Sequence, residues 1–322
     1  MAAQVPTERL NESPPLSLPS HIAERLRLPA IAAPMFLVSG VDMVLAACKA
    51  GIIGSFPANN ARSLEELDAW MGTINSTLPA AAPPWAINIM VHRSYARWEE
   101  ELELVLKHKP PIVITALGSP TAVVQAIQGY GGLVYADVNS LTYAQKAAKT
   151  GVDGLILVAS GAGGHTGPIS GFAFAPAVRE WFDGTIVLGG GIGTGRAIRA
   201  ARMLGADLAY LGTRLIACAE SMAVPGYKQM LIEATAEDVV TSAALTGIPA
   251  NWLKGSLLAA GYDSEGMKAK AEINLGRPED AAKRWRDVWS AGHGAGQVKA
   301  IEPLAQIVDE MARDYAQAGQ AG

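Results

Sequence analysis

One histidine lies in a setting that suits acid–base chemistry. His165 belongs to the run Ser160-Gly161-Ala162-Gly163-Gly164-His165-Thr166-Gly167, which directly follows an apolar stretch expected to be a strand. The glycines that precede it let the backbone take positive φ and approach a flat or anionic ligand closely. An imidazole is a natural general base near neutral pH. His165 is therefore the candidate base, and a capping or turn histidine is the structural alternative.

Two further glycine clusters follow later apolar stretches. The first is Gly189-Gly190-Gly191-Ile192-Gly193 and the second is Leu211-Gly212-Thr213-Arg214. In barrels of alternating strands and helices, the loops after the last two strands often form a phosphate site. Simple turn chemistry is the alternative for each cluster taken alone. The backbone N–H groups predicted to hold a phosphate dianion are those of Gly190, Gly191, Gly212 and Thr213.

Other strand ends carry weaker signals. Ala33-Pro34-Met35 ends the first expected strand, and its thioether either lies against an aromatic ring system or serves the core. Asn88 interrupts an apolar strand, and a buried amide needs partners that a ligand or the protein must supply. Asp137 ends the fifth strand, on the side where catalytic residues gather, and is a weak candidate. Asp153 precedes the sixth strand and is expected to be structural.

The elements that must position these residues alternate in type from residue 30 to about 234. The apolar runs are nearly continuous, which is typical of strands buried on both faces. Eight strands, each followed by a helix, predict an α/β fold, a (β/α)8 TIM barrel; an open doubly wound sheet is the alternative. No Gly-x-Gly-x-x-Gly follows the first strand, which favours the barrel. The expected strands are Ala30–Phe36, Ile52–Pro57, Trp85–Met90, Ile112–Ala116, Leu133–Val138, Gly154–Ala159, Thr185–Gly189 and Leu208–Gly212, and the expected helices between them are Ser63–Asn75, Ser94–Lys109, Thr121–Tyr130, Leu141–Thr150, Ala175–Asp183 and Thr194–Leu204.

The sequence divides into four segments. Residues 1–28 are expected to be a loose arm rich in proline, and residues 29–234 the barrel. Residues 235–300 break the alternation and are expected to form a small helical subdomain or lid beside the barrel mouth. In the last segment, residues 301–322, an amphipathic helix at Pro303–Gln317 is expected to pack back on the barrel and complete it.

Composition narrows the class of protein. The 322 residues are 50% hydrophobic and 17% charged, which excludes global disorder. A formal net charge of −4 argues against nucleic-acid binding. The two cysteines, Cys48 and Cys218, are far apart, which excludes a disulfide scaffold and fits a reducing compartment. Residues 110–136 are uncharged, but prolines and glycines punctuate them, so a membrane helix is rejected. A cytoplasmic protein with no nucleic-acid, membrane or metal partner is expected.

The motifs, taken as a set, resemble the nitronate monooxygenase family, formerly called 2-nitropropane dioxygenases. The resemblance covers roughly residues 29–314. The matching pieces are Ala33-Pro34-Met35, Ala162-Gly163-Gly164-His165, Gly189-Gly190-Gly191-Ile192, Ala206-Asp207 with Leu211-Gly212-Thr213-Arg214, and the stretch from Trp289 to Gly296.

The resemblance implies an FMN-dependent oxidoreductase, a flavoprotein that converts a nitronate or nitroalkane and O2 to a carbonyl compound and nitrite. It implies that His165 removes the proton α to the nitro group. The cofactor supplies the redox chemistry, and the protein positions it. A small-molecule substrate and O2 are the implied partners, and a homodimer is an open option. The implied FMN contacts are Ala33, Pro34, Met35, Asn88, Ser160, Gly164, Gly190, Gly191, Gly212 and Thr213.

The sequence departs from the family's pattern at three places. Many members carry a glutamine late in the sixth strand and an acidic residue before the glycines, where this chain has Val158 and Gly161. Ser160 is the residue that could replace the lost flavin contact. His293 stands where the family's C-terminal segment has glutamine, so a second titratable group could face the ligand. The departures indicate a divergent branch whose substrate need not be a nitronate.

Other functions fit the same motifs. An FMN-dependent NAD(P)H oxidoreductase, such as a quinone or enoyl-thioester reductase, would use His165 as a proton donor or a positioning group. A phosphate-ligand barrel without flavin, such as an isomerase, lyase or aldolase, would normally place a lysine or paired acids at strand ends, and here only Asp137 stands there. A non-enzymatic binding protein would leave the His165 loop unexplained.

Overall fold

Eight parallel strands close into a barrel. The computed structural model describes residues 17–92, 94–262 and 288–320. The strands pair in the order β1-β9-β8-β6-β5-β4-β3-β2, and a parallel bridge between Ile31 and Ile53 joins the two ends of that order. The predicted α/β barrel is confirmed. The strands are β1 (Ala30–Ala32), β2 (Gly54–Pro57), β3 (Trp85–Met90), β4 (Ile112–Ala116), β5 (Leu133–Val138), β6 (Gly154–Val158), β8 (Thr185–Gly189) and β9 (Leu208–Leu211).

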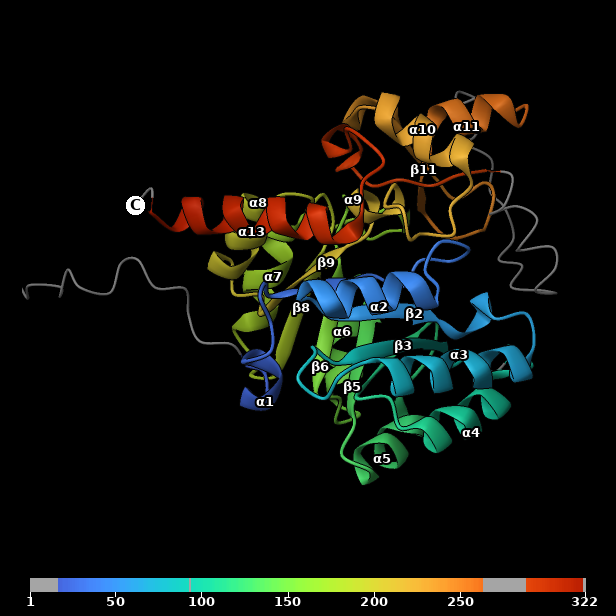
Figure 1. Ribbon diagram of the computed structural model, residues 1–322, viewed down its shortest axis with the longest axis vertical. Coiled ribbons are helices and arrows are strands. Elements are labelled where there is room, and N and C mark those ends of the chain that lie inside the picture. The colour runs from blue at the N-terminus through green and yellow to red at the C-terminus, as the bar shows by residue number, and fades with distance from the viewer. Residues whose placement is uncertain (1–16, 93, 263–287, 321–322) are drawn as a thin grey trace, which may run out of the picture.

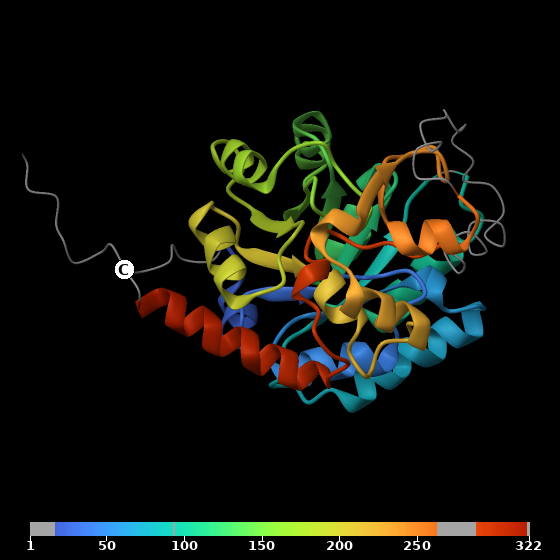
Figure 2. The same cartoon turned by 90° about the horizontal axis from the view of Figure 1, so that it is seen from above.

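Helices surround the strands, as Figure 2 shows from above. The last long helix, α13, packs against α8 and α2, so a segment from the end of the chain fills the gap in the ring. None of the described helices is long and apolar enough to span a bilayer. The helices are α1 (Ser20–Ala23), α2 (Val41–Ala50), α3 (Leu64–Thr77), α4 (Trp98–His108), α5 (Thr121–Gly129), α6 (Leu141–Ala148), α7 (Gly171–Arg179), α8 (Gly195–Met203), α9 (Thr213–Ile216), α10 (Pro225–Glu233), α11 (Lys254–Ala259) and α13 (Leu304–Gln320).

Local signals fix several helix starts. Ser63 caps α3 by accepting a hydrogen bond from the N–H of Glu66. Ser140 and Thr194 cap α6 and α8 in the same way, through the N–H groups of Tyr143 and Ala197. A side-chain oxygen at this position satisfies one of the N–H groups that a helix leaves unbonded at its first turn. The helices that follow β2, β5 and β8 therefore begin where the sequence places a cap.

The structure differs from the expected elements at a few boundaries. The first strand ends at Ala32 rather than Phe36, because the chain turns through Pro34, which has no N–H to donate. Helix α2 was not predicted, and α7 begins at Gly171 rather than Ala175. Helix α4 begins at Trp98 rather than Ser94. For the first strand, α4 and α7 the apolar pattern was found but its end was placed by periodicity alone, whereas α2 was missed entirely.

Side chains on each barrel strand alternate between the interior and the layer under the helices. On β5, Tyr135 packs in the interior with Ile156 and Leu208, whereas Val134 and Ala136 pack under the helices. The same alternation, applied strand by strand, defines the innermost residues at the carboxyl ends of the strands, here called the mouth layer. The mouth layer consists of Ala33, Ser55, Asn88, Ala116, Asp137, Val158, Gly189 and Tyr210.

A small antiparallel sheet lies over the mouth, together with α10 and α11 (Figure 1). Its strands are β10 (Val239–Ser242), β11 (Ala250–Leu253) and β7 (Gly164–His165). Trp252 of β11 is fully buried in a separate apolar cluster with Leu257 and Val288. The segment after residue 234 was expected to be helical, and its described part contains these two strands as well as helix α11.

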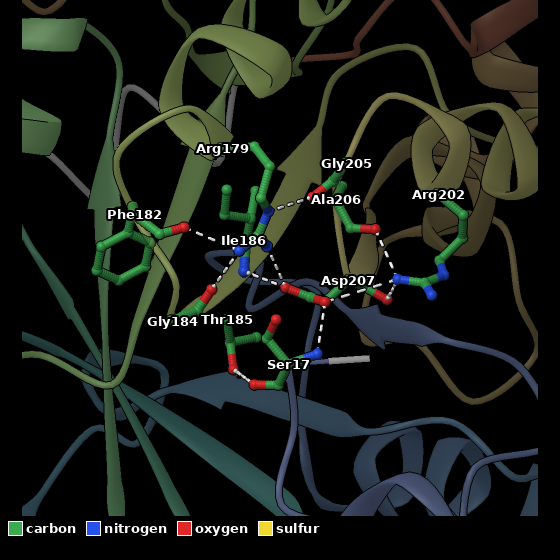
Figure 3. A network of polar contacts seen from close by, with 10 residues as sticks. All are labelled: Ser17, Arg179, Phe182, Gly184, Thr185, Ile186, Arg202, Gly205, Ala206 and Asp207. Atoms are coloured by element: carbon green, nitrogen blue, oxygen red, sulfur yellow. Dashed lines mark hydrogen bonds and ion pairs between the residues drawn. The ribbon is translucent and has the colours of Figure 1, made fainter. Parts of the chain in front are cut away.

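The opposite end of the barrel is closed by a polar network (Figure 3). The two oxygens of Asp207 accept hydrogen bonds from the backbone N–H groups of Ser17 and Ile186, each at 2.7 Å. Arg179 donates to Oδ2 at 2.5 Å, and Arg202 lies 3.6 Å from Oδ1. Asp207 thus ties the N-terminal arm, β8 and two helices to the start of β9.

Candidate functional site

The loops that leave the barrel at its carboxyl end meet over the mouth layer. A Cβ on Gly161 would lie 3.2 Å from the backbone of Gly190 and Gly191, so the loops after β6 and β8 touch. A Cβ on Gly163 would lie 2.7 Å from the nitrogen of Gly292 in the C-terminal segment. A side chain at Gly163 would clash with this backbone nitrogen, and one at Gly161 would be tightly packed. The glycine clusters predicted from the sequence therefore lie side by side.

The loop after β8 presents backbone N–H groups to open space. Gly190 and Gly191 have φ of 129° and 72°, in the region that favours glycine. Within the described residues, the N–H groups of Gly190, Gly191 and Ile192 donate to no protein acceptor. A Cβ on Gly191 would have no atom within 4 Å, so the loop faces open space. Successive free N–H groups in such a turn form a concave site for an anion.

The loop after β9 approaches the first strand. A Cβ on Gly212 would lie 3.7 Å from the sulfur of Met35, which places these two predicted contacts together. The hydroxyl of Thr213 accepts a hydrogen bond from the N–H of Gly292, so this side chain holds the C-terminal segment. Arg214 is buried and donates to Glu302 and Glu310, both at 3.1 Å. Arg214 therefore anchors α13 and the residues before it.

His165 lies on β7 and is held over the mouth by β11. It pairs with Ala250, and Gly164 pairs with Asn251. Asn251 is fully buried, and its amide donates to the carbonyls of Ser160 and Ala162 at 3.0 and 2.7 Å. Burial lowers the pKa of His165, so its ring is neutral near pH 7. Asn251 was not singled out from the sequence, since nothing local marks an asparagine that braces a loop 90 residues away.

The turn after β1 is braced by a second asparagine. Asn60 donates to the carbonyls of Met35 and Ser39 at 3.0 and 2.7 Å and accepts from the N–H of Leu37 at 2.8 Å. Leu37 has a φ of 60°, a strained value for a leucine. This turn presents Pro34 and Met35, both partly exposed, at the edge of the mouth. Asn60 was likewise not predicted as part of the site.

The remaining predicted contacts are spread round the mouth. Asn88 is a buried member of the mouth layer, and its amide donates to the carbonyl of Ile114 over a long 3.4 Å. Gly164 has a φ of 66°. Ser160 is partly exposed. His293 has an exposed side chain, and its backbone N–H donates to the carbonyl of Gly161 at 3.0 Å. Of Asn88, Ser160, Gly164 and His293, Asn88 is the most buried.

Asp137 and Tyr210 complete the polar part of the mouth layer. Burial raises the pKa of Asp137 to about 7. Burial also raises the pKa of Tyr210, and the Asp137 carboxylate raises it further. Tyr210 was not predicted, although its place two residues after an interior leucine of the same strand was a usable signal.

The two cysteine thiols are unreactive. Cys48 and Cys218 are buried free thiols, and burial raises the pKa of each to about 12. A thiol in this state is a poor nucleophile. Asp153, expected to be structural, accepts hydrogen bonds from Val134 and Gln128 at the amino end of the barrel. The mouth therefore brings together a neutral histidine, a loop with free backbone N–H groups and several polar side chains of the mouth layer.

The sequence is similar to nitronate monooxygenases over most of its length. A family model described as nitronate monooxygenase matches residues 22–314. A nitronate monooxygenase of Paraburkholderia phytofirmans is 26% identical, over 90% of this chain and 92% of its own length. A bicyclic carboxyl-CoA dehydrogenase of Mycobacterium tuberculosis is 26% identical, over 75% of this chain and 68% of its own.

Two solved structures share the barrel. Nitroalkane oxidase from Streptomyces ansochromogenes has a TM-score of 0.79 and 23% identity, covering 94% of this chain and 99% of its own. FabK from Thermotoga maritima has a TM-score of 0.78 and 22% identity, covering 94% and 96%. At this identity the likeness establishes the fold.

Proposed function

Because this oxidoreductase belongs to the nitronate monooxygenase family, we propose that it binds FMN at the barrel mouth and oxidises a nitronate or nitroalkane with O2 to a carbonyl compound and nitrite. The observation that carries the proposal is the meeting of three features at one end of the barrel. These are the neutral His165, the open glycine loop at Gly190 and Gly191, and the Met35 turn.

The residues at the mouth fit FMN. The phosphate suits the N–H groups of Gly190 and Gly191, which have no protein acceptor among the described residues, and we assign Gly212 and Thr213 of the loop after β9 to the same group. Pro34 and Met35 would line the ring, and Asn88, Ser160 and Gly164 lie round it. FMN, when bound, supplies the two-electron redox chemistry that side chains lack.

His165 is the proposed base for a neutral nitroalkane. Because burial lowers its pKa, the ring is neutral at pH 7 and is the proposed acceptor of the proton α to the nitro group. Asn251 fixes the loop before it, and the pairing of Gly164 and His165 with β11 fixes its place. A preformed nitronate has already lost this proton, so it needs no base.

The small sheet and its helices are proposed to cover the reacting groups. β10 and β11 join β7 above the mouth, and the C-terminal segment packs on the loop after β6 through Gly292 and Gly163. A covered mouth excludes water and strengthens the electrostatic interactions inside it. The partner molecules are then a small substrate and O2, which need only a narrow access.

An anaerobic reduction assay tests the proposed function. The purified holoprotein is mixed with propyl-2-nitronate or with NADH in separate cuvettes, and the flavin absorbance near its visible maximum is followed. Bleaching by the nitronate alone is the expected result. Bleaching by NADH alone would instead assign the NAD(P)H oxidoreductase activity. Absence of a flavin spectrum after reconstitution with FMN would exclude both.

A further inference from the structure

Two polar side chains of the mouth layer have no role in the function proposed above. Asp137 on β5 and Tyr210 on β9 both point into the barrel at its carboxyl end. Oδ1 of Asp137 and the hydroxyl of Tyr210 are buried, and neither has a hydrogen-bond partner within the described part of the chain. Because buried polar atoms in folded proteins are nearly always paired, two such atoms in one layer of the barrel interior indicate a ligand group that pairs with them.

Beneath these two groups lies an apolar layer of the barrel interior. The layer beneath them contains Tyr135, Ile156, Val187 and Leu208. Gly189 belongs to β8, the strand next to β9. A Cβ on Gly189 would lie 3.2 Å from the Cβ of Tyr210, so the glycine leaves room for the tyrosine ring. The site has a firm apolar floor with two polar groups above it.

Other titratable groups lie away from the Asp137 carboxyl. In the described residues, strands β4 and β6, on either side of β5, and helix α5 carry no titratable side chain. Among the eight described barrel strands, Asp137 is the sole carboxyl. Helix α6 carries Tyr143 and Lys146, which are exposed and contact each other. Tyr135 of the same strand lies toward the other end of the barrel, near Asp153 and Asp207. Tyr210 faces Asp137 across the interior, and His165 of β7 lies above the mouth.

The charge state of the pair follows from this setting. Without a cation, burial holds the pKa of Asp137 near 7, so the carboxyl is protonated below neutrality. Tyr210 keeps its proton throughout the working range, since its pKa is raised. A protonated carboxyl and a phenol both present an O–H donor, as a neutral carboxylic acid in an apolar site is able to do.

We propose that Asp137 is a cofactor-binding residue whose protonated carboxyl donates a hydrogen bond to an acceptor on the FMN ring, with Tyr210 donating beside it. The inference rests on the proposed binding of FMN at this mouth. The ring carbonyls and unprotonated ring nitrogens are acceptors, and the mouth layer is the surface on which a ring held by Met35 and Asn88 would lie. An ionised Asp137 would offer no donor and would add a buried charge, so FMN binding is coupled to protonation of this carboxyl.

The coupling predicts a pH-dependent affinity for FMN. Above the pKa of Asp137 in the free protein, each pH unit weakens binding about tenfold, because one proton must be taken up with the ligand. Equilibrium dialysis of the holoprotein against buffers of pH 6.5 to 9 at constant ionic strength, with released FMN read by its fluorescence, measures the dissociation constant. Wild type is expected to lose affinity above about pH 7.

Variants assign the effect to Asp137. Asp137→Asn keeps the shape and an N–H donor that does not titrate, so its affinity is expected to be flat over the same range. Asp137→Ser serves if the first variant does not fold. Asp153→Asn, which changes a carboxyl near the amino end of the neighbouring strand, is the matched control and keeps the wild-type profile. Ionisation of the FMN phosphate contributes equally to every variant.

The outcomes separate the inference from the proposed function. A wild-type slope that Asp137→Asn abolishes supports the inference. Identical profiles for wild type and Asp137→Asn, with FMN bound by both, overturn it and leave the proposed function standing. Failure of the wild-type protein to bind FMN at any pH overturns both.

Discussion

The two ends of the barrel differ in how a buried carboxyl group is hydrogen-bonded. Asp207 at the amino end accepts two backbone N–H bonds and lies beside two arginines. Asp137 at the carboxyl end has a buried oxygen with no hydrogen-bond partner among the described residues, and burial raises its pKa. A satisfied carboxylate stabilises the fold, whereas an unsatisfied one costs stability and persists where function needs it. This difference supports our proposal that the carboxyl end of the barrel binds the ligands.

The largest effect is expected at the mouth, on the rate of turnover of a neutral nitroalkane. His165→Ala should slow turnover of a neutral nitroalkane by about 10²- to 10⁴-fold, because a general base contributes that much. Turnover of the preformed nitronate should change far less, since its proton is already gone. Steady-state kinetics with both forms of one substrate measure the split. Equal losses on the two forms would reject the base role and leave His165 with a structural one.

The next largest effect is expected at the amino end, on stability. Asp207→Asn should lower the free energy of unfolding by about 3–5 kcal/mol, because it leaves Arg179 and Arg202 without their shared carboxylate. Urea unfolding followed by circular dichroism measures the change. Asp309→Asn is the control, since its ion pair with Arg27 is exposed and should contribute less than about 1 kcal/mol. Similar losses in the two variants would contradict the structural role of the Asp207 network.

A smaller effect, on FMN affinity, is expected in the glycine loop after β8. Gly191→Asp should weaken FMN binding about 10- to 100-fold relative to Gly191→Asn, because it places a carboxylate beside the phosphate. Asparagine and aspartate tolerate positive φ similarly, so the pair isolates charge from backbone strain. Fluorescence titration with FMN gives both dissociation constants. Equal affinities would move the phosphate away from this loop.

Much of the fold was predictable because strands buried on both faces leave continuous apolar runs in the sequence. Strands β3, β4, β5 and β8 have the predicted bounds. The first strand ended early because Pro34 and the Asn60 brace impose a turn that periodicity cannot show. The two strands β10 and β11 were missed because short strands over a mouth lack the regular βα period.

The site was predictable only where its chemistry is local. The glycine clusters and His165 are recognisable from a few consecutive residues of the sequence. Asn60 and Asn251 act on loops far away in sequence, and the electrostatic influence of Asp137 on Tyr210 depends on which face of each strand points inward. The two asparagine braces leave no local mark in the sequence, whereas the inward face of Tyr210 follows from strand alternation once the strand is recognised.

The most direct test of the account is the sign of two stability changes at pH 8, measured by urea unfolding in the same buffer without FMN. The pKa of Asp137 is about 7 in the folded protein and about 3.9 unfolded, so ionisation destabilises the fold increasingly from about pH 4 to pH 7 and fully above that. Asp137→Asn should therefore raise the free energy of unfolding by about 2–4 kcal/mol at pH 8, with the gain shrinking toward pH 4. Asp207→Asn should lower it. If both variants lose stability alike, the mouth is as structural as the opposite end, and the assignment of function to the mouth is contradicted.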